Sequence, residues 1–212
     1  MHATTSSKST RFCGIAAALL LAGCASAPTH FYTLSAPLPT TSAPAAQDAR
    51  IFIEVVPIAM PERLVRPQLV VRSAGSASSA RVDILEQERW SSSFNNELRD
   101  ALANGIANRL GATDVSRNGR PTDQPVYRIA IELRQFDAVP GQQVQATYGW
   151  TISRSGSSRS SACQLSVTEA VAPGIDALVL GVQRTVADAV NGIAANLMAF
   201  KANPATAAAC QG

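Results

Sequence analysis

Apolar residues alternate with polar ones in the middle of the chain, and this period of two is typical of strands that bury one face. Three such stretches follow one another between residues 127 and 167, separated by Pro140-Gly141 and by the serine-rich residues 154–161. Their apolar positions are Tyr127, Ile129, Ile131 and Leu133; Val144, Ala146, Tyr148, Trp150 and Ile152; and Cys163, Leu165 and Val167. We expect three antiparallel strands joined by turns.

Three shorter apolar stretches come earlier in the chain and predict further strands. They cover residues 51–56, 64–72 and 81–85, and small residues at 73–79 separate the last two. We expect these strands to form an antiparallel meander.

Two regions have apolar residues at intervals of three and four, the spacing of a helix with one buried face. In residues 88–110 the stripe starts at Trp90 and ends before Gly111, while Glu97 is expected to face away from the core. The second region follows Pro173-Gly174 and runs to Phe200. The sequence therefore predicts an α+β fold, with a single antiparallel or mixed β-sheet and two amphipathic helices packed on one face.

The N-terminus has the three parts of a secretory signal peptide. Lys8 and Arg11 precede an apolar run, residues 12–21, and two small residues precede Cys24. This ending resembles a bacterial lipobox, in which the thiol receives a diacylglyceryl group, the leader is removed and the new amine is acylated. Two or more acyl chains give stable anchoring. The apolar run is about half of what a transmembrane helix needs, and an ordinary signal peptide with an incidental cysteine is the alternative.

These features divide the chain into four parts. Residues 1–23 are the predicted lipoprotein signal peptide, and residues 24–49 a proline-rich, lipid-anchored tether. Within the tether, Phe31-Tyr32-Thr33-Leu34 is expected to dock on the domain as a short strand, because its clustered apolar side chains would otherwise form a sticky patch. Residues 50–201 form one domain and residues 202–212 a tail.

The charge of the mature chain indicates no nucleic-acid partner. Removal of the first 23 of 212 residues leaves 189, and 16 of the 18 basic residues then stand against 15 acidic ones, a net charge of +1. Because the two signs are interspersed, no basic surface for a phosphate backbone is expected.

The residue types of the mature chain also argue against an enzyme. His2 leaves with the leader and His30 stands in the tether, so the domain has no histidine for a Ser-His-Asp triad or a histidine zinc site. No glycine-rich phosphate loop follows a predicted strand. A hydrolase built from carboxylates alone stays open, although the acidic residues fall mostly at positions expected to be exposed. We expect no catalytic residue, no metal and no cofactor beyond the covalent lipid on Cys24.

Two further cysteines, Cys163 and Cys210, remain in the mature chain. An exported protein meets an oxidising compartment, in which a leftover pair of thiols tends to be joined. We predict a Cys163–Cys210 disulfide that pins the tail to the sheet. The alternative is that Cys163 is a buried core thiol, since it has the strand parity of Leu165 and Val167.

A set of short motifs runs along the mature chain. The most specific is Arg66-Pro67-Gln68-Leu69-Val70-Val71-Arg72, which ends a longer run that starts at Met60. The others are Phe31-Tyr32-Thr33-Leu34, Val56-Pro57, Glu88-Arg89-Trp90, Tyr127-Arg128-Ile129, Phe136-Asp137-Ala138, Pro140-Gly141, Trp150 and the C-terminal helix. With these motifs the chain resembles the PqiC-like ABC-type transport auxiliary lipoproteins over nearly its whole mature length.

The resemblance implies an outer-membrane lipoprotein that faces the periplasm. Its partner would be an MCE (mammalian cell entry) domain protein, which forms the lipid conduit of an inner-membrane ABC transporter. The implied role is docking in lipid traffic and envelope integrity. Ala25 agrees with outer-membrane placement, because Gram-negative sorting retains lipoproteins in the inner membrane mainly when aspartate stands after the lipidated cysteine.

Two other functions stay open at this point. One is a periplasmic lipid carrier that binds acyl chains between helices and sheet, where small residues such as Ala101, Gly105, Ala189 and Ala194 could leave room. The other is a pilot-type assembly lipoprotein for a different outer-membrane complex. A homo-oligomer formed through a sheet edge is also open.

The candidate partner-binding residues lie in one segment and are Arg63, Leu64, Val65, Arg66, Gln68 and Arg72. We expect Leu64 and Val65 to be exposed, with the multi-donor polar side chains around them. Arginine is enriched where proteins meet. The alternative is that Pro67 and Gln68 merely shape a strand edge while the arginines stay solvated.

Overall fold

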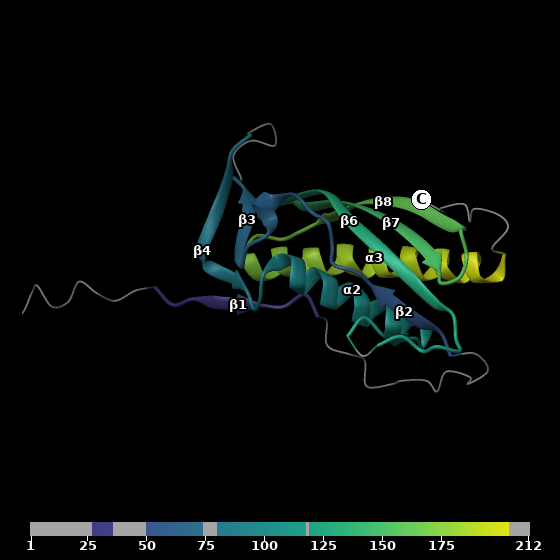
Figure 1. Ribbon diagram of the computed structural model, residues 1–212. Coiled ribbons are helices and arrows are strands. Elements are labelled where there is room, and N and C mark those ends of the chain that lie inside the picture. The colour runs from purple at the N-terminus through teal and green to yellow at the C-terminus, as the bar shows by residue number, and fades with distance from the viewer. Residues whose placement is uncertain (1–26, 36–49, 74–79, 118, 204–212) are drawn as a thin grey trace, which may run out of the picture.

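The computed structural model describes residues 27–35, 50–73, 80–117 and 119–203, which form two sheets, two long helices and one 3-10 helix. The elements in chain order are β1 (His30–Tyr32), β2 (Phe52–Val55), η2 (Glu62–Leu64), β3 (Gln68–Arg72), β4 (Val82–Trp90), α2 (Phe94–Leu110), β5 (Thr113–Asp114), β6 (Val126–Val139), β7 (Gln143–Arg154), β8 (Ser160–Ala170) and α3 (Ile175–Ala202). Figure 1 shows β6, β7 and β8 spread along the two helices, with β1, β3 and β4 together at one end of the molecule.

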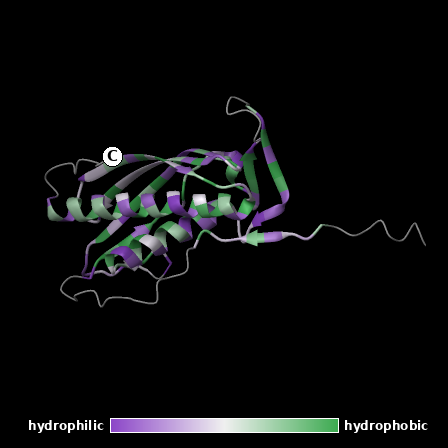
Figure 2. Cartoon of the chain, turned by 180° about the vertical axis from the view of Figure 1, so that it is seen from behind, coloured by the Kyte–Doolittle hydropathy of each residue, from purple (hydrophilic) through white to green (hydrophobic). Residues whose placement is uncertain are grey.

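The larger sheet has five strands in the order β5-β2-β6-β7-β8. β6, β7 and β8 are antiparallel neighbours, as the alternation predicted, and Trp150 lies opposite both Ile131 and Cys163. α2 and α3 cover the face that carries these residues, whereas Arg128 and Glu132 are exposed on the other face. The views from both sides show the helices on the same face (Figures 1 and 2). The α+β class is therefore confirmed.

The remaining strands form a second sheet, so the expectation of a single sheet is wrong. Its order is β1-β4-β3, in which β3 and β4 are the expected antiparallel hairpin and β1 is parallel to β4. The expected meander is wrong as well, because β2 lies between β5 and β6 and runs parallel to both. Pro57, Pro61 and Pro67 lie between β2 and β3. Proline has no amide hydrogen to donate to a strand partner, so β2 ends before Pro57. Ala59 still makes one parallel bridge to Glu132 of β6, and beyond it the chain leaves the larger sheet and β3 starts another.

The first long helix starts later than its apolar stripe suggested. Trp90 is the last residue of β4, where its amide donates to the Pro67 carbonyl at 2.7 Å. Three serines follow, and Ser93, with an extended backbone, precedes the first helical residue, Phe94. The helix ends at Gly111, which has the left-handed conformation (φ 60°) that favours glycine.

The core between the helices and the larger sheet is apolar with a few paired polar groups. α2 and α3 pack closely, because a Cβ placed on Gly105 would lie 2.6 Å from Val190 Cγ2. Under α3, the Trp150 indole donates to Asn196 Oδ1 at 3.1 Å, and Asn196 Nδ2 donates to Ser161 Oγ at 3.0 Å. Paired polar groups of this kind fix how a helix sits on a sheet.

Candidate functional site

The segment that follows the predicted lipid anchor is bound firmly to the domain. β1 pairs with the end of β4, with Phe31 opposite Arg89 and Tyr32 opposite Trp90. The Ser91 amide donates to the Tyr32 carbonyl at 2.7 Å. We call residues 29–34, together with the two glutamates that bind them, Glu88 and Glu97, the N-terminal clamp.

Glu97, in the first turn of α2, is the buried part of this clamp. Its carboxylate accepts hydrogen bonds from Thr33 Oγ1 at 2.9 Å and from the Leu34 amide at 3.0 Å. Ser91 and Ser92 donate to its other oxygen at 2.6 and 3.2 Å. Burial alone would raise the pKa of Glu97, but these donors outweigh it and hold the pKa below its usual range. The site therefore favours the charged carboxylate.

Glu88, in β4, binds the other end of the segment. Tyr32 Oη donates to it at 2.7 Å, and His30 Nδ1 lies 3.0 Å from it. Burial would raise the pKa of Glu88, but these two partners lower it. Burial and the adjacent carboxylate raise the pKa of Tyr32, so its hydroxyl remains a donor. Leu34, two residues after Tyr32, is buried in the core. Gln183 of α3 donates to the Thr33 carbonyl at 2.9 Å.

Sequence reasoning missed these glutamates, and it was wrong about one of them. Glu97 was expected to face away from the core, yet its exposed fraction is 9%. Consecutive serines followed by a glutamate in the first helical turn are a helix-start signature that could have drawn attention to it. What the sequence could not show is that two of its four donors, Thr33 and Leu34, come from a segment more than sixty residues away.

The segment predicted to bind a partner lies at the same end of the molecule, in η2 and β3. Arg63 is exposed and so is Val65, with an exposed fraction of 49%. Leu64, however, is 3% exposed, so the expectation that it is exposed is wrong. A 3-10 turn has three residues per turn, and here it points Leu64 into the core while its neighbours face outward.

The other three predicted residues are partly covered and engaged within the chain. Gln68 donates to Glu86 at 3.2 Å, and Arg72 forms an ion pair with Asp137 of β6. Arg66 is also partly buried, with its Nε atom covered and without a hydrogen-bond partner. The structure thus brings the six residues into one region, but it leaves Arg63 and Val65 as the two with outward-facing side chains.

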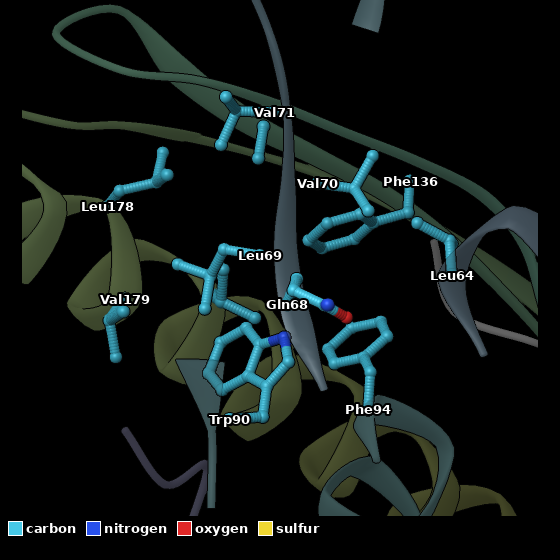
Figure 3. Close-up of a pocket in the computed structure, with 12 residues that line it drawn as sticks. Leu64, Gln68, Leu69, Val70, Val71, Trp90, Phe94, Phe136, Leu178 and Val179 are labelled. Atoms are coloured by element: carbon cyan, nitrogen blue, oxygen red, sulfur yellow. The ribbon is translucent and has the colours of Figure 1, made fainter. Parts of the chain in front are cut away.

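A small pocket lies behind β3, where the smaller sheet meets α2 and α3 (Figure 3). Trp90 and Phe94 stack there with ring centres 5.3 Å apart, and Phe136 packs against Phe94 at 5.2 Å. The pocket volume is about 10 Å³. Since that is close to the least space that one water molecule needs, the side chains fill this junction.

The predicted lipidation and disulfide sites fall partly outside the described residues. Cys24 and Cys210 both lie there, so neither can be placed. Cys163 faces the core from β8 and takes part in a disulfide. Its pairing with Cys210 stays a prediction.

Within the described ranges, no three histidine, cysteine or carboxylate side chains gather as a metal site would require. Neither long helix of the described part has both the length and the apolar content needed to cross a membrane.

Two proteins of known structure share this fold. The crystal structure of an uncharacterized protein is similar over 81% of this chain and 99% of its own, with 18% identity and a TM-score of 0.63. A crystal structure of a protein from Xanthomonas campestris, of the family DUF330, is similar over 84% of this chain and 100% of its own, with 13% identity and a TM-score of 0.61. These likenesses show a shared fold.

No curated protein matches the sequence at a significant level. The family described as "ABC-type transport auxiliary lipoprotein component" matches residues 32–194, which start in β1 and end in α3. That span includes residues 32–34 and both glutamates of the clamp, every strand except the start of β1, and nearly all of the core. The chain belongs to the ABC-type transport auxiliary lipoprotein family.

Proposed function

We propose that the chain is the outer-membrane docking subunit of an MCE-type ABC lipid transport system. Acyl chains on Cys24 hold it in the outer membrane, and the domain faces the periplasm and binds the MCE protein. The observation that carries this proposal is the family match over residues 32–194. The clamp supports it, because a subunit that docks between a membrane and a partner needs a fixed connection between its anchor and its binding surface.

The surface proposed for the MCE protein is the outward side of η2, formed by Arg63 and Val65. Val65 offers an exposed apolar side chain, and Arg63 beside it offers a guanidinium with several donors. Leu64 between them is buried and fixes the turn. A rigid turn that presents an arginine and an apolar side chain is the composition expected at the centre of a protein interface.

The lipid-carrier alternative is less well supported by the packing of the described residues. Sites for drug-sized ligands usually have roughly 300–1,000 Å³, whereas the pocket at the junction of the sheets has about 10 Å³. Of the two roles open to a small residue here, leaving room or permitting close packing, Gly105 has the second, because it lets the helices approach each other. An open groove of about 370 Å³ between the C-terminal halves of α2 and α3 includes Arg109 and Met198. It lies on the surface, so an acyl chain there would stay in contact with water.

Co-purification from detergent-solubilised membranes tests the docking function. The MCE protein should co-purify with the wild-type chain and be lost with the double variant Arg63→Glu, Val65→Asp. Arg128→Glu, which reverses an exposed charge on the far face of the larger sheet, is the matched control and should retain the partner. Absence of the MCE protein from the wild-type sample would contradict the proposal. Phospholipid bound to the folded domain in native mass spectrometry would favour the carrier.

A further inference from the structure

Exposed apolar side chains gather on one face of the smaller sheet. Phe31 is 66% exposed, Val82 41% and Ile84 42%, which makes three of the six large apolar side chains exposed in the described residues. Figure 2 shows hydrophobic stretches alternating with hydrophilic ones along β4 at this end of the molecule.

The strand register puts these three side chains on the same face. Phe31 is opposite Arg89 of β4, and Arg89 is opposite Gln68 of β3. The register shifts between Gln68 and Leu69, because β4 has three extra residues, 86–88, between the partners of these two. On β3 itself Gln68 still shares its face with Val70 and Arg72, because residues two apart on a strand point the same way. Val70 pairs with Ile84 and Arg72 pairs with Val82. We call Phe31, Val82 and Ile84 the apolar face of the smaller sheet.

The chain itself limits how far this face can lie from the predicted anchor. Six positions separate Cys24 from His30, the first residue of β1. A chain extends by at most about 3.3–3.6 Å per residue, so His30 lies within about 20 Å of the Cys24 acyl group whatever conformation the segment takes. Most of the domain, by contrast, can lie much further away.

β1 cannot detach from the domain without breaking the N-terminal clamp. It is held by parallel pairing with β4, by Glu88 and by the buried Glu97. Phe31 is therefore fixed on a surface that lies within a short reach of the predicted anchor. Met198, near the C-terminal end of α3, is also exposed, at 45%. It lies 23 residues beyond the start of α3 and is therefore far from that start, because a helix rises about 1.5 Å per residue.

We propose that the apolar face of the smaller sheet lies against the lipid bilayer that holds the Cys24 acyl chains. Phe31, Val82 and Ile84 enter the boundary between headgroups and acyl chains, as the apolar side of a peripheral membrane protein does. Arg81 and Arg89 flank this face, and each is paired with a carboxylate of β4, Arg81 with Asp83 at 3.1 Å and Arg89 with Glu86 at 3.6 Å. Because the flank carries both signs of charge, the apolar side chains supply the contact with the bilayer. The inference rests on the proposed lipidation of Cys24, and it fixes which side of the domain is turned to the membrane.

Quenching by brominated lipids tests this orientation in the full acylated chain. Trp90 and Trp150 are buried, so a tryptophan placed at the surface reports its own surroundings. Phe31→Trp should lose more than half of its added emission in phosphatidylethanolamine–phosphatidylglycerol vesicles brominated on the acyl chains, and its spectrum should shift to the blue. Met198→Trp, an exposed position at the far end of α3, is the matched control and should keep its emission.

Flotation of the same vesicles and the mass of the N-terminal peptide separate the outcomes. In one outcome the chain is acylated and floats, but quenching is equal at positions 31 and 198 or absent at 31. That result would overturn the proposed orientation and would leave the docking function unaffected. Chain that carries no acyl group and does not float overturns the anchor, and with it both proposals. Replacing Val82 and Ile84 by serine in the Phe31→Trp chain should give less quenching than Phe31→Trp alone. Unchanged quenching would show that these two residues lie outside the contact.

Discussion

The two sheets of this protein differ in how far their apolar side chains are buried. In the larger sheet the inward side chains of β6 and β7, such as Ile129 and Ile152, are fully buried under the helices, and the outer face is polar. In the smaller sheet the inner face is buried through Leu69 and Trp90, while the outer face keeps apolar side chains in water. An outer face of that kind costs solubility unless something covers it. The larger sheet thus supplies most of the buried core, and the smaller sheet is the one that we propose to meet the membrane.

The two regions also differ in how far polar contacts hold them in place. The larger sheet and its helices depend on apolar burial, to which the area removed from water contributes most. The smaller sheet also packs on the core through Leu69 and Trp90, but polar contacts add to its attachment. Arg72 pairs with Asp137 of β6, and Glu97 of α2 binds the segment that follows β1. Substitutions in the core under the larger sheet should therefore destabilise the whole domain. Substitutions in the polar contacts should loosen the smaller sheet locally.

The largest effect is expected from a cavity in the main core. Leu102 of α2 is completely buried, so Leu102→Ala should lower the free energy of unfolding by about 2–5 kcal/mol. Ile84→Ala, on the apolar face of the smaller sheet, removes a side chain that is already partly hydrated and should change it by no more than about 0.5 kcal/mol. Urea unfolding followed by circular dichroism measures both. Similar losses in the two variants would contradict the division between the sheets.

A smaller loss is expected where α3 is fixed to the larger sheet by polar groups. Asn196→Ala leaves the Trp150 indole and the Ser161 hydroxyl buried without their partner, which should cost about 1–3 kcal/mol. Asn191→Ala, five residues earlier at an exposed position of the same helix, is the matched control. The shift in thermal midpoint measures the difference, and an equal shift in both variants would refute a structural role for the buried amide.

The main layer of the fold could be predicted because its information is local. The alternation over β6, β7 and β8 is set by neighbouring residues, and Gly111 marks a helix end by its own backbone preference. The start of α2 could not be predicted from the apolar stripe alone. Trp90 has the spacing of a helical residue, but its pairing with Tyr32 places it in β4.

The candidate site depends on contacts between distant parts of the chain, and here the sequence was less informative. The docking of residues 31–34 was expected from their hydrophobicity, but their partners Glu88 and Glu97 lie more than fifty residues away. The orientation of Leu64 depended on the turn geometry of η2, which its apolar character does not specify. Residue type thus indicated the region, and tertiary pairing decided which side chains face outward.

A local effect is expected from weakening the clamp. Glu97→Gln keeps the size of the side chain but replaces a carboxylate that four donors bind with an amide that has one acceptor oxygen. The Leu34 amide should exchange with solvent about tenfold faster, since a charge-assisted bond contributes about 1.5–3 kcal/mol. The protection of Leu102, in the main core, should hardly change.

Glu132→Gln, which neutralises an exposed carboxylate on the outer face of the larger sheet, serves as the control for that exchange measurement. It should leave the Leu34 amide as protected as in the wild-type chain. Equal acceleration at Leu34 and Leu102 in Glu97→Gln would show that the clamp and the core unfold together, and the comparison between the sheets would then fail.

The smallest and most selective effect is expected from pH. The folded chain holds the pKa values of Glu88 and Glu97 below their usual range, whereas the unfolded chain titrates them near the ordinary value of about 4.3. The unfolded state therefore takes up protons first as the pH falls, so the contribution of both carboxylates is complete above about pH 5 and is lost as the pH passes through the lower folded values. The Leu34 amide chemical shift, followed from about pH 6 down to pH 3, should move with this loss while core resonances of α2 and β7 stay in place. In Glu97→Gln the same amide should titrate weakly, because Glu88 alone remains to respond, and a full titration there would assign the pH response to a group outside the clamp.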